Sequence, residues 1–216
     1  MSKNCIIRLS RYKYAILRLK SIGFVRVFSD NLADAIGVTP AQVRKDFSLF
    51  GISGNRRGGY QIEELIGKLN NILGKDQVQK VVLVGAGHLA TALMKYKGFE
   101  KEGIDIVACF DIDPSKFTTT ADVPVYPLDS LKAYLGDHTI RIGIIAVPDI
   151  AAQAVLDQLV AAGIKGVLNF APIGLRGPEG IVINNINLEL ELENLIYFVN
   201  VQQKAERNDE SARPQI

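Results

Sequence analysis

The chain contains no tryptophan, only two cysteines and two histidines, and no long hydrophobic run. Cys5 and Cys109 lie far apart and lack metal-ligand spacing, so we expect neither a disulfide framework nor a metal site. No apolar run reaches the roughly 18 residues that span a bilayer. The N-terminus also lacks the apolar stretch and cleavage site of a signal peptide. We therefore expect a cytoplasmic protein with no membrane contact.

Acidic residues are scarce in the first third of the chain. Residues 1–75 contain 13 Lys and Arg against 5 Asp and Glu, a net charge of +8, whereas residues 76–216 contain 12 against 18, a net charge of −6. The 216 residues are 48% hydrophobic and 22% charged, which suits two ordinary domains with packed cores. The charge division predicts a polyanionic partner for the first domain alone. The alternative is that basic surface residues fall early by chance.

The first third has the helix and turn signals of a helix-turn-helix domain. Thr39 can cap a helix, Pro40 suits its first position, and Gln42 can complete a capping box. The glycine-rich segment 51–60, with two adjacent arginines, predicts a hairpin wing. Helical spacing and stop signals predict helices over residues 6–22, over DNLADAI before Gly37, from Pro40 to about Phe50, and over residues 62–73.

The polar face of the helix after Thr39 is suited to the DNA major groove, where Gln, Arg and Lys reach base edges and phosphates. Wing arginines gain from the stronger negative potential of a narrow minor groove. A structural three-helix bundle with a solvated basic face is the alternative. The basic residues of the first helix, including Arg8, are interpreted as its solvated face. The candidate DNA-binding residues are Gln42, Arg44, Lys45, Ser48, Arg56 and Arg57.

After a polar linker at residues 74–80, apolar runs alternate with helical segments, which is typical of a parallel sheet with crossover helices. The apolar cover of the last helix is too broad for a lone surface helix, so we expect it to contact its own domain and a second subunit. Strands are predicted at residues 81–84, 104–110, 123–126, 141–147 and 166–170, and helices at residues 128–135, 149–162 and 187–206.

GAGHLA at residues 85–90 follows a predicted strand and precedes a helix, as in dinucleotide-binding folds. Gly85 permits the tight turn, Gly87 lets the backbone approach a pyrophosphate, and Ala90 allows close packing of helix on strand. The free N–H groups of the helix N-terminus would face the pyrophosphate. Asp111, at the end of the next strand, would bind a ribose 2′-hydroxyl and repel a 2′-phosphate. This favours NAD(H) over NADP(H).

The sequence offers no obvious proton donor for a dehydrogenase, so we do not expect an enzyme or a catalytic residue. His88 is expected at the helix N-terminus near a phosphate, and His138 in a solvated turn. No room for a substrate domain remains after residue 183. Asp113 lies beyond the strand end and is interpreted as a cap of the following turn rather than a ribose partner.

Several of these segments together resemble the Rex family of bacterial redox-sensing repressors, over roughly residues 6–200. They are QVRKDFSLFG at 42–51, GNRRGGY at 54–60, GAGHLA at 85–90, FDIDPSK at 110–116, AVP at 146–148 and AAGIKGVLNFAP at 161–172. The resemblance implies an α/β protein with an N-terminal winged helix-turn-helix domain and a Rossmann-type dinucleotide-binding domain, with a C-terminal helix exchanged in a homodimer. The corresponding boundaries are residues 1–75, 81–183 and 184–206, with a disordered tail at 207–216.

The resemblance also implies a function. Family members repress transcription from an inverted-repeat DNA operator, are released by NADH, and bind NAD+ without release. Arg44 and Lys45 would contact the operator, Arg56 would enter the minor groove, and Tyr60 would end the wing. The implied cofactor-binding residues are Gly85, Ala86, Gly87, His88, Leu89, Ala90, Tyr96, Asp111, Val147, Pro148, Asn169, Phe170, Ala171 and Pro172.

The chain departs from the family pattern at identifiable positions. Arg57 replaces a wing glycine, which would cost about 1 kcal/mol if this residue needs a positive φ. Tyr14 and Asn187 stand where relatives often carry an arginine and an aspartate that form an ion pair. Two alternatives remain open: an oxidoreductase with a DNA-binding appendage, which would turn over a hydroxy acid or aldehyde, and a Rex-like dimeric interaction protein that has lost sensing or DNA binding.

Overall fold

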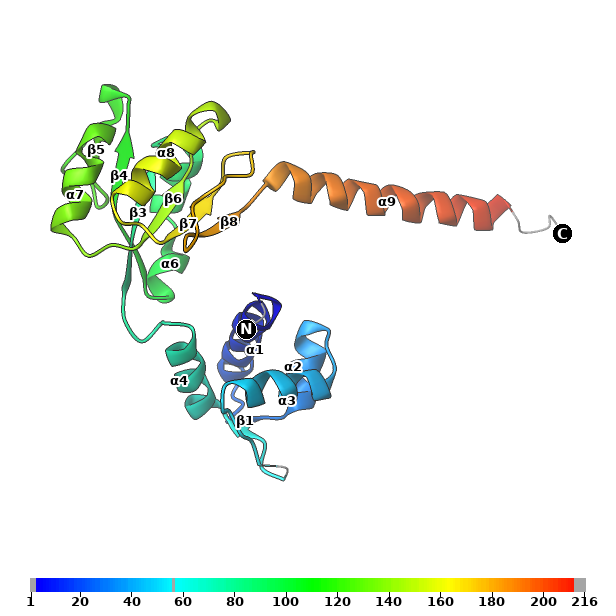
Figure 1. Ribbon diagram of the computed structural model, residues 1–216. Helices are drawn as coiled ribbons and strands as arrows, with labels where there is room; N and C mark the ends of the chain where they lie inside the picture. Colours follow the sequence, from blue (N-terminus) through cyan, green and yellow to red (C-terminus); the bar gives the residue numbers. More distant parts are fainter. Residues whose placement is uncertain (1–2, 56, 212–216) are drawn as a thin grey trace. The chain divides into compact units, whose positions relative to one another are not determined.

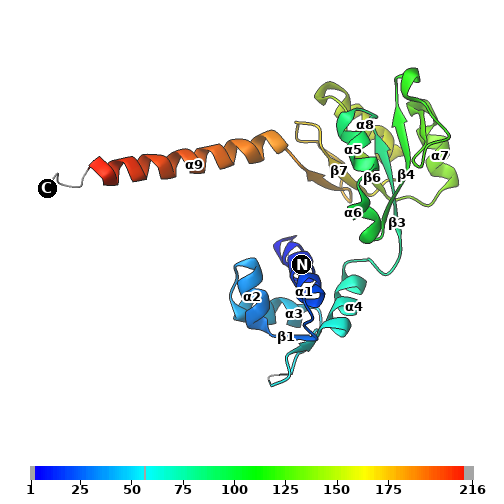
Figure 2. The same ribbon diagram turned by 180° about the vertical axis from the view of Figure 1, so that it is seen from behind.

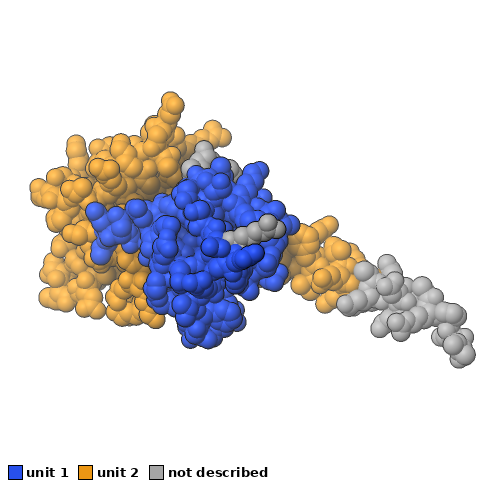
Figure 3. Space-filling model, turned by 90° about the horizontal axis from the view of Figure 1, so that it is seen from below, with its two compact units in different colours: residues 1–78 blue, residues 79–216 orange. Residues whose placement is uncertain are grey.

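The structure is a computed structural model that describes residues 3–55 and 57–211 (Figure 1). The chain divides into two compact units, residues 1–78 and residues 79–216, which Figure 3 colours separately. We call them unit 1 and unit 2. Their boundary falls inside the segment that the sequence assigns to a linker. Arg56, one of the two wing arginines, lies outside the described residues. None of the described helices is long and apolar enough to cross a membrane.

Unit 1 is a winged helix-turn-helix domain (Figure 1). The apolar side of its first helix explains the packing, because Leu9, Tyr12 and Ile16 follow helical spacing and are fully buried in one core with Val43 and Phe47. The two short strands pair in antiparallel register. The elements are α1 (Lys3–Ser21), β1 (Arg26–Val27), α2 (Ser29–Ile36), α3 (Pro40–Leu49), β2 (Tyr60–Gln61) and α4 (Ile62–Ile72).

The start of α3 follows the sequence signals only in part. Thr39 caps the helix, since its Oγ1 accepts a hydrogen bond from the Gln42 N–H at 3.2 Å, and Pro40 is the first helical residue. The Gln42 side chain does not complete the predicted capping box. Its amide donates instead to Asp46, one turn further along the helix. Thr39 and Pro40 therefore fix this helix start without a capping box.

The wing closes through an antiparallel bridge between Asn55 and Gly59. Gly59 adopts φ of 62°, and a Cβ at this position would lie 2.4 Å from the Val27 carbonyl oxygen. No residue other than glycine has a positive φ in the described chain, Arg57 included. The conformational cost considered for Arg57 therefore does not arise, because Gly59 takes the left-handed position.

Unit 2 is a Rossmann-type domain built on a six-stranded parallel sheet in the order β5-β4-β3-β6-β7-β8. This is the strand order of dinucleotide-binding folds, with a topological switch point between the two central strands, β3 and β6. The sequence did not predict the edge strand β8, whose four residues are mostly exposed and include two asparagines. The strands are β3 (Gln79–Val84), β4 (Ile104–Asp111), β5 (Val125–Pro127), β6 (Ile142–Ile145), β7 (Gly166–Asn169) and β8 (Val182–Asn185).

Helices cover both faces of this sheet, as Figures 1 and 2 show. The central strands are apolar on both sides, so Val82 and Val84 enter one core and Val81 and Leu83 enter the other. The first core includes apolar residues of α7 and α8, and the second those of α5 and α6. The sequence did not predict α6. These helices are α5 (His88–Met94), α6 (Lys97–Lys101), α7 (Leu131–Asp137) and α8 (Asp149–Ala161).

The last helix, α9, runs from Leu188 to Ser211. It is longer than the 187–206 predicted from sequence, because residues 207–211, expected in the tail, continue the helix; residues 212–216 lie outside the described chain. Asn187 caps its first turn, since Oδ1 accepts the Leu190 N–H at 3.0 Å. Every side chain from Leu188 to Lys204 is exposed. The exposed apolar residues of α9 are Leu188, Leu190, Leu192, Leu195, Ile196, Tyr197, Phe198, Val199 and Val201.

Candidate functional sites

The polar face of α3 presents three of the predicted DNA-binding residues to solvent. Arg44, Lys45 and Ser48 are exposed, and so is Arg57 in the wing. Gln42 differs from the prediction, because it is half-buried and its amide donates to Asp46 Oδ1 at 2.8 Å. Arg44 also borders a hollow of about 560 Å³, together with residues of the wing and of the start of α2. The structure thus brings α3 and the wing to one surface, with Gln42 turned inward.

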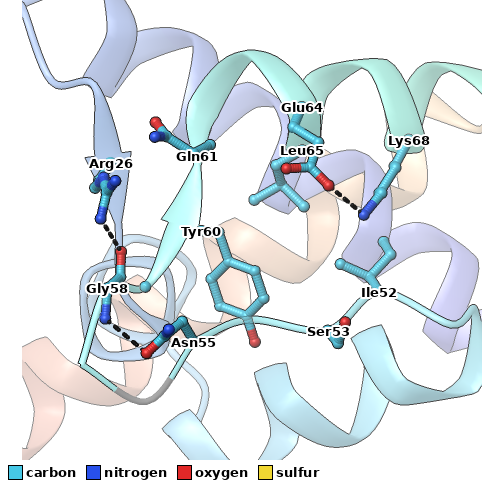
Figure 4. A pocket seen from close by; sticks show the side chains of 11 residues that line it. Arg26, Ile52, Ser53, Asn55, Gly58, Tyr60, Gln61, Glu64, Leu65 and Lys68 are labelled. Atoms are coloured by element: carbon cyan, nitrogen blue, oxygen red, sulfur yellow. Dashed lines mark hydrogen bonds and ion pairs between the residues drawn. The ribbon is translucent and has the colours of Figure 1, made fainter.

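Tyr60 lies beneath the wing and not at its tip. Its ring packs edge-on against Phe47 of α3, with centroids 5.2 Å apart. Figure 4 shows the ring pointing into a cavity of about 290 Å³ between the wing and α4. On the other side of this cavity, Arg26 Nη1 donates to the Gly58 carbonyl oxygen at 3.3 Å. Tyr60 therefore supports the wing from beneath, and the exposed Arg26 ties the wing to β1. The prediction of Tyr60 as a DNA-contacting residue stays a prediction.

A buried carboxylate beneath α3 was not predicted. Asp46 is 1% exposed. Arg8 Nε and Nη2 donate to its two oxygens at 2.6 and 2.8 Å, and the Tyr12 hydroxyl donates at 3.0 Å. Arg8 was interpreted from sequence as part of a solvated face; that interpretation is wrong, because the guanidinium is held in this ion pair. Burial raises the pKa of the Asp46 carboxyl, but the hydrogen bonds from Arg8 and its neighbours outweigh burial and lower the pKa to about 2.

The glycine loop of unit 2 begins where β3 ends. Gly85 adopts φ of 96°, and a Cβ there would lie 2.4 Å from the Ala146 carbonyl oxygen at the end of β6. Its N–H donates to the Phe110 carbonyl oxygen at 2.7 Å, at the end of β4. Gly85 is thus a glycine because its positive φ and the chain at the end of β6 leave no place for a side chain. The loop continues through Gly87, which is exposed, into α5, whose packing residue Ala90 is fully buried.

Asp111 at the end of β4 is 7% exposed and is tied to the glycine loop. Its Oδ2 accepts the Ala86 N–H at 2.5 Å and faces Lys116 Nζ at 3.3 Å, while its Oδ1 accepts the Asp113 N–H at 2.8 Å. Burial raises the pKa of the Asp111 carboxyl, but these donors outweigh burial and hold the pKa below its usual range. Asp111 therefore both fixes the loop and stays ionised beside it.

The carboxyl ends of β6 and β7 lie beside this loop, because β6 pairs with β3 and β7 pairs with β6. Val147 and Phe170 are half-buried, whereas Pro148 and Pro172 are exposed. Asn169 was expected to line an open cleft, but it is fully buried. Its Nδ2 donates to the carbonyl oxygens of Ala171 and Ile173 and to Asn185 Oδ1, so it shapes the turn after β7. Ala171, also buried, donates its N–H back to Asn169 Oδ1 at 2.9 Å.

The remaining predicted cofactor residues lie on the surface of unit 2. His88 and Leu89 are exposed in the first turn of α5. Tyr96 is 60% exposed, and its ring packs edge-on against Phe99 with centroids 5.1 Å apart. His138 stacks on the Tyr134 ring, away from the glycine loop in sequence and on another helix end. The glycine loop, Asp111 and the ends of β6 and β7 thus form one candidate site, with Tyr96 beyond the end of α5.

Comparison with known proteins identifies both units. Residues 1–48 match the family described as putative DNA-binding protein N-terminus, and residues 76–173 match the CoA binding domain family. The redox-sensing transcriptional repressor Rex of Desulforamulus reducens is 42% identical over 200 residues, 92% of this chain and 95% of that protein. The Bacillus subtilis repressor of the same name is 40% identical over 193 residues, covering 89% of each. This chain belongs to the Rex family.

Solved Rex-family structures resemble this chain over nearly its whole length. The repressor RSP in complex with β-NAD+ and operator DNA is 34% identical, with a TM-score of 0.88 over 99% of both chains. RSP in complex with β-NADH is 35% identical, with a TM-score of 0.85 over 96% of this chain and 98% of that one. These relatives are transcriptional repressors by name, which favours a regulator over the enzyme considered from sequence.

Proposed function

We propose that this chain is a cytoplasmic transcriptional repressor that binds an operator through unit 1 and is released when unit 2 binds NADH. One observation carries the proposal: exposed basic residues on α3 and a glycine loop at the switch point of a Rossmann sheet occur in one chain. Relatives that share both units have been crystallised with operator DNA and with each nucleotide. NADH and NAD+ are accordingly the proposed ligands, and we propose no catalytic role.

On this proposal α3 enters the major groove. Arg44 and Lys45 contact bases or phosphates, and Ser48 adds a hydrogen-bonding group on the same exposed face. The wing arginines, Arg56 and Arg57, lie over the minor groove, where a narrow groove concentrates negative potential. Tyr60 and Gln42 would contribute from beneath this surface, since each is half-buried and engaged with another residue of unit 1.

The proposed dinucleotide site lies at the carboxyl ends of β3, β4, β6 and β7. The pyrophosphate would lie on residues 85–90, whose backbone N–H groups precede or begin α5. Asp111 would accept a bond from the adenosine ribose and repel a 2′-phosphate. A carboxylate offers about four lone-pair positions, and three are used within the chain, so one remains for a hydroxyl. Val147, Pro148, Phe170 and Pro172 would border the ribose and nicotinamide.

We further propose a homodimer formed through α9. Its exposed leucines and aromatic residues continue round more than one side of the helix. An isolated helix with this much exposed apolar surface is unfavourable in water, and a second copy of the chain would cover it. A two-fold dimer then presents two α3 helices to the two halves of an inverted repeat. Tyr96 would lie at the junction of dimer and cofactor.

Equilibrium DNA binding tests the proposal. The probe is an inverted-repeat duplex that the chain itself enriches from random-sequence DNA, titrated with NADH, NAD+ and NADPH at one stated salt concentration. We expect NADH to weaken binding strongly and NAD+ to leave it largely intact. DNA binding that none of the nucleotides changes would contradict the regulatory function, and turnover of a hydroxy acid or aldehyde with NADH would favour an oxidoreductase.

A further inference from the structure

Helices α1 and α3 are joined by a cluster of polar side chains beneath the DNA-binding face, of which Gln42 alone is also a proposed contributor to that face. We call it the Asp46 cluster; it consists of Cys5, Arg8, Tyr12, Gln42 and Asp46. Arg8 binds both carboxylate oxygens of Asp46, so the pair is a two-point contact rather than a single ion pair. Asp46 accepts all of these bonds while 1% exposed. The cluster is therefore a built polar contact inside a small apolar core.

Stability alone gives a weak reason for such a cluster. The cost of removing two charges from water often cancels their attraction, and well-packed apolar residues of similar volume are commonly as stabilising. The same two helices already have an apolar contact, in which the Tyr12 and Phe47 rings pack edge-on with centroids 5.3 Å apart. Apolar contacts fix the relative orientation of two helices poorly, because they tolerate small rotations and shifts. A two-point hydrogen bond from a guanidinium to a carboxylate does not tolerate them.

The placement of the cluster on α3 connects it to the exposed basic face. Gln42 and Asp46 are four residues apart and lie on the same side of the helix, facing Arg8 and Tyr12, which are four residues apart on α1. Arg44 and Lys45 lie between Gln42 and Asp46 in sequence and point outward. Successive helix residues differ by about 100°, so a rotation of α3 by one residue would replace Asp46 by Lys45 at the buried position.

We propose that Asp46 is a positioning residue for DNA recognition: acting through Arg8, it fixes the rotation of α3 and so the direction in which Arg44, Lys45 and Ser48 face the groove. This inference rests on the proposed DNA-binding function. Asp46 has no exposed surface with which to touch DNA itself. We therefore expect Asp46 to affect mainly the discrimination between DNA sequences, because that depends on the direction of the side chains on α3. General attraction to phosphates should depend on it much less.

The test replaces the pair by apolar residues, Arg8→Met with Asp46→Leu, in the full-length chain. This double substitution keeps the net charge and leaves no unpaired buried charge, although the Tyr12 hydroxyl and the Gln42 amide lose Asp46 as their acceptor. The probes are the enriched inverted-repeat duplex and a shuffled duplex of equal length, each measured over a range of salt concentrations. We expect the chain to stay folded, with a thermal midpoint above that of Arg8→Met alone, because no charge is left buried without its partner. Affinity for the enriched duplex should fall at least about tenfold, the effect of one lost base contact, while shuffled-duplex affinity and the salt slope stay unchanged.

The matched control is Lys20→Gln with Glu63→Gln, which removes an exposed ion pair of the same unit at 2.8 Å and also keeps the net charge. It should change neither affinity. A second variant, Asp46→Asn, keeps the shape of the side chain and serves if the double variant fails to fold. It should lower the preference for the enriched duplex over the shuffled duplex by a smaller factor than the double substitution. Wild-type preference retained in folded variants would overturn the positioning role alone. A wild-type chain that enriches no duplex would overturn DNA recognition and the positioning role with it.

Discussion

Each unit places a buried aspartate beneath a surface that we assign to a ligand, and the two are used differently. Asp46 accepts five hydrogen bonds from side chains of α1 and α3, which saturates a carboxylate. Asp111 accepts from two backbone N–H groups and Lys116, which leaves one position open. The saturated carboxylate can only orient other groups. The unsaturated one can hold its loop and also bind a ligand directly.

Removing α9 tests whether the two units can perform their functions separately, and has the largest expected effect. A chain that ends at Asn187 lacks the exposed apolar helix, so we expect a monomer or an unstable protein. Tight binding to an inverted-repeat duplex should be lost, since one α3 reaches one half-site. Sedimentation equilibrium and DNA binding check this. A soluble truncated monomer with wild-type operator affinity and NADH response would contradict the dimer.

Arg8→Met tests how much the stability of unit 1 depends on the ion pair of Asp46. Asp46 would stay buried without its main partner, and breaking a buried pair costs about 3–5 kcal/mol. The value should lie at the lower end, because Tyr12 and Gln42 still donate to Asp46. Urea unfolding followed by circular dichroism measures the loss. A change below about 1 kcal/mol would mean that the pair contributes nothing to the fold.

The acid dependence of unit 1 follows from the same carboxyl. Its pKa is lowered from 3.8 to about 2 in the folded chain, so its stabilising contribution is full above about pH 4 and is lost as the pH falls towards 2. In Arg8→Met the folded pKa of Asp46 should rise, and the acid transition of unit 1 should move to higher pH. The same shift in the Lys20→Gln, Glu63→Gln control would rule out Asp46 as its source.

Two glycine substitutions separate loop geometry from ligand contact in unit 2. Gly85→Ala forces a Cβ against the Ala146 carbonyl oxygen at a positive φ, which should destabilise the unit by about 2 kcal/mol or more. A Cβ on Gly87 meets no described atom within 4 Å, so Gly87→Ala should fold normally. If a pyrophosphate lies against Gly87, this variant should still bind NADH more weakly. Calorimetric melting and NADH titration distinguish the two effects.

The exposed residues above the saturated aspartate should behave as ligand contacts. Arg44→Ala or Lys45→Ala should weaken operator binding by about 1–3 kcal/mol if the residue reaches a base, and should lower the salt slope by about one if it reaches a phosphate. NADH affinity should stay unchanged, because both residues belong to unit 1. Operator binding unaltered in both variants would remove the assignment of α3 as the recognition helix.

Asp111→Ala tests the open position of the unsaturated aspartate, with the smallest expected effect. We expect NADH affinity to fall by roughly 1–2 kcal/mol, because the variant loses the ribose hydrogen bond and the Ala86 contact that holds the loop, and we expect the preference for NADH over NADPH to narrow. Removing the carboxylate also frees Lys116 to approach a 2′-phosphate. Asp113→Ala is the control for the neighbouring charge, because Asp113 binds Ser115 in an exposed turn and also lies 3.9 Å from Lys116 Nζ. A wild-type chain that binds NADPH as tightly as NADH would contradict the ribose assignment.

Local signals in the sequence predicted much of this architecture. The Thr39-Pro40 helix start, the glycine loop at residue 85 and the alternation of apolar runs with helices each depend on neighbouring residues, and the fold class follows from them. The edge strand β8 was missed, because an exposed strand does not need an apolar run. The helix α6 was missed because five residues carry little periodicity.

The sequence predicted the residues of the candidate sites only where a side chain contacts residues close to it in the chain. Asp46 and Arg8 are 38 residues apart, and nothing in either local pattern links them. Asn169 was expected in a cleft, but its amide is used by the turn after β7 and by Asn185. Such contacts between distant residues depend on the packing of whole elements, which spacing along the chain does not encode.

The most direct test of dinucleotide control is the reciprocity of the two binding events. The NADH dissociation constant is measured with and without saturating inverted-repeat duplex, and the duplex dissociation constant with and without saturating NADH, at one salt concentration. Because coupling between two sites is a single free energy, we expect both constants to rise by the same factor. An NADH affinity that the duplex leaves unchanged, in a chain that binds both, would contradict control of unit 1 by unit 2.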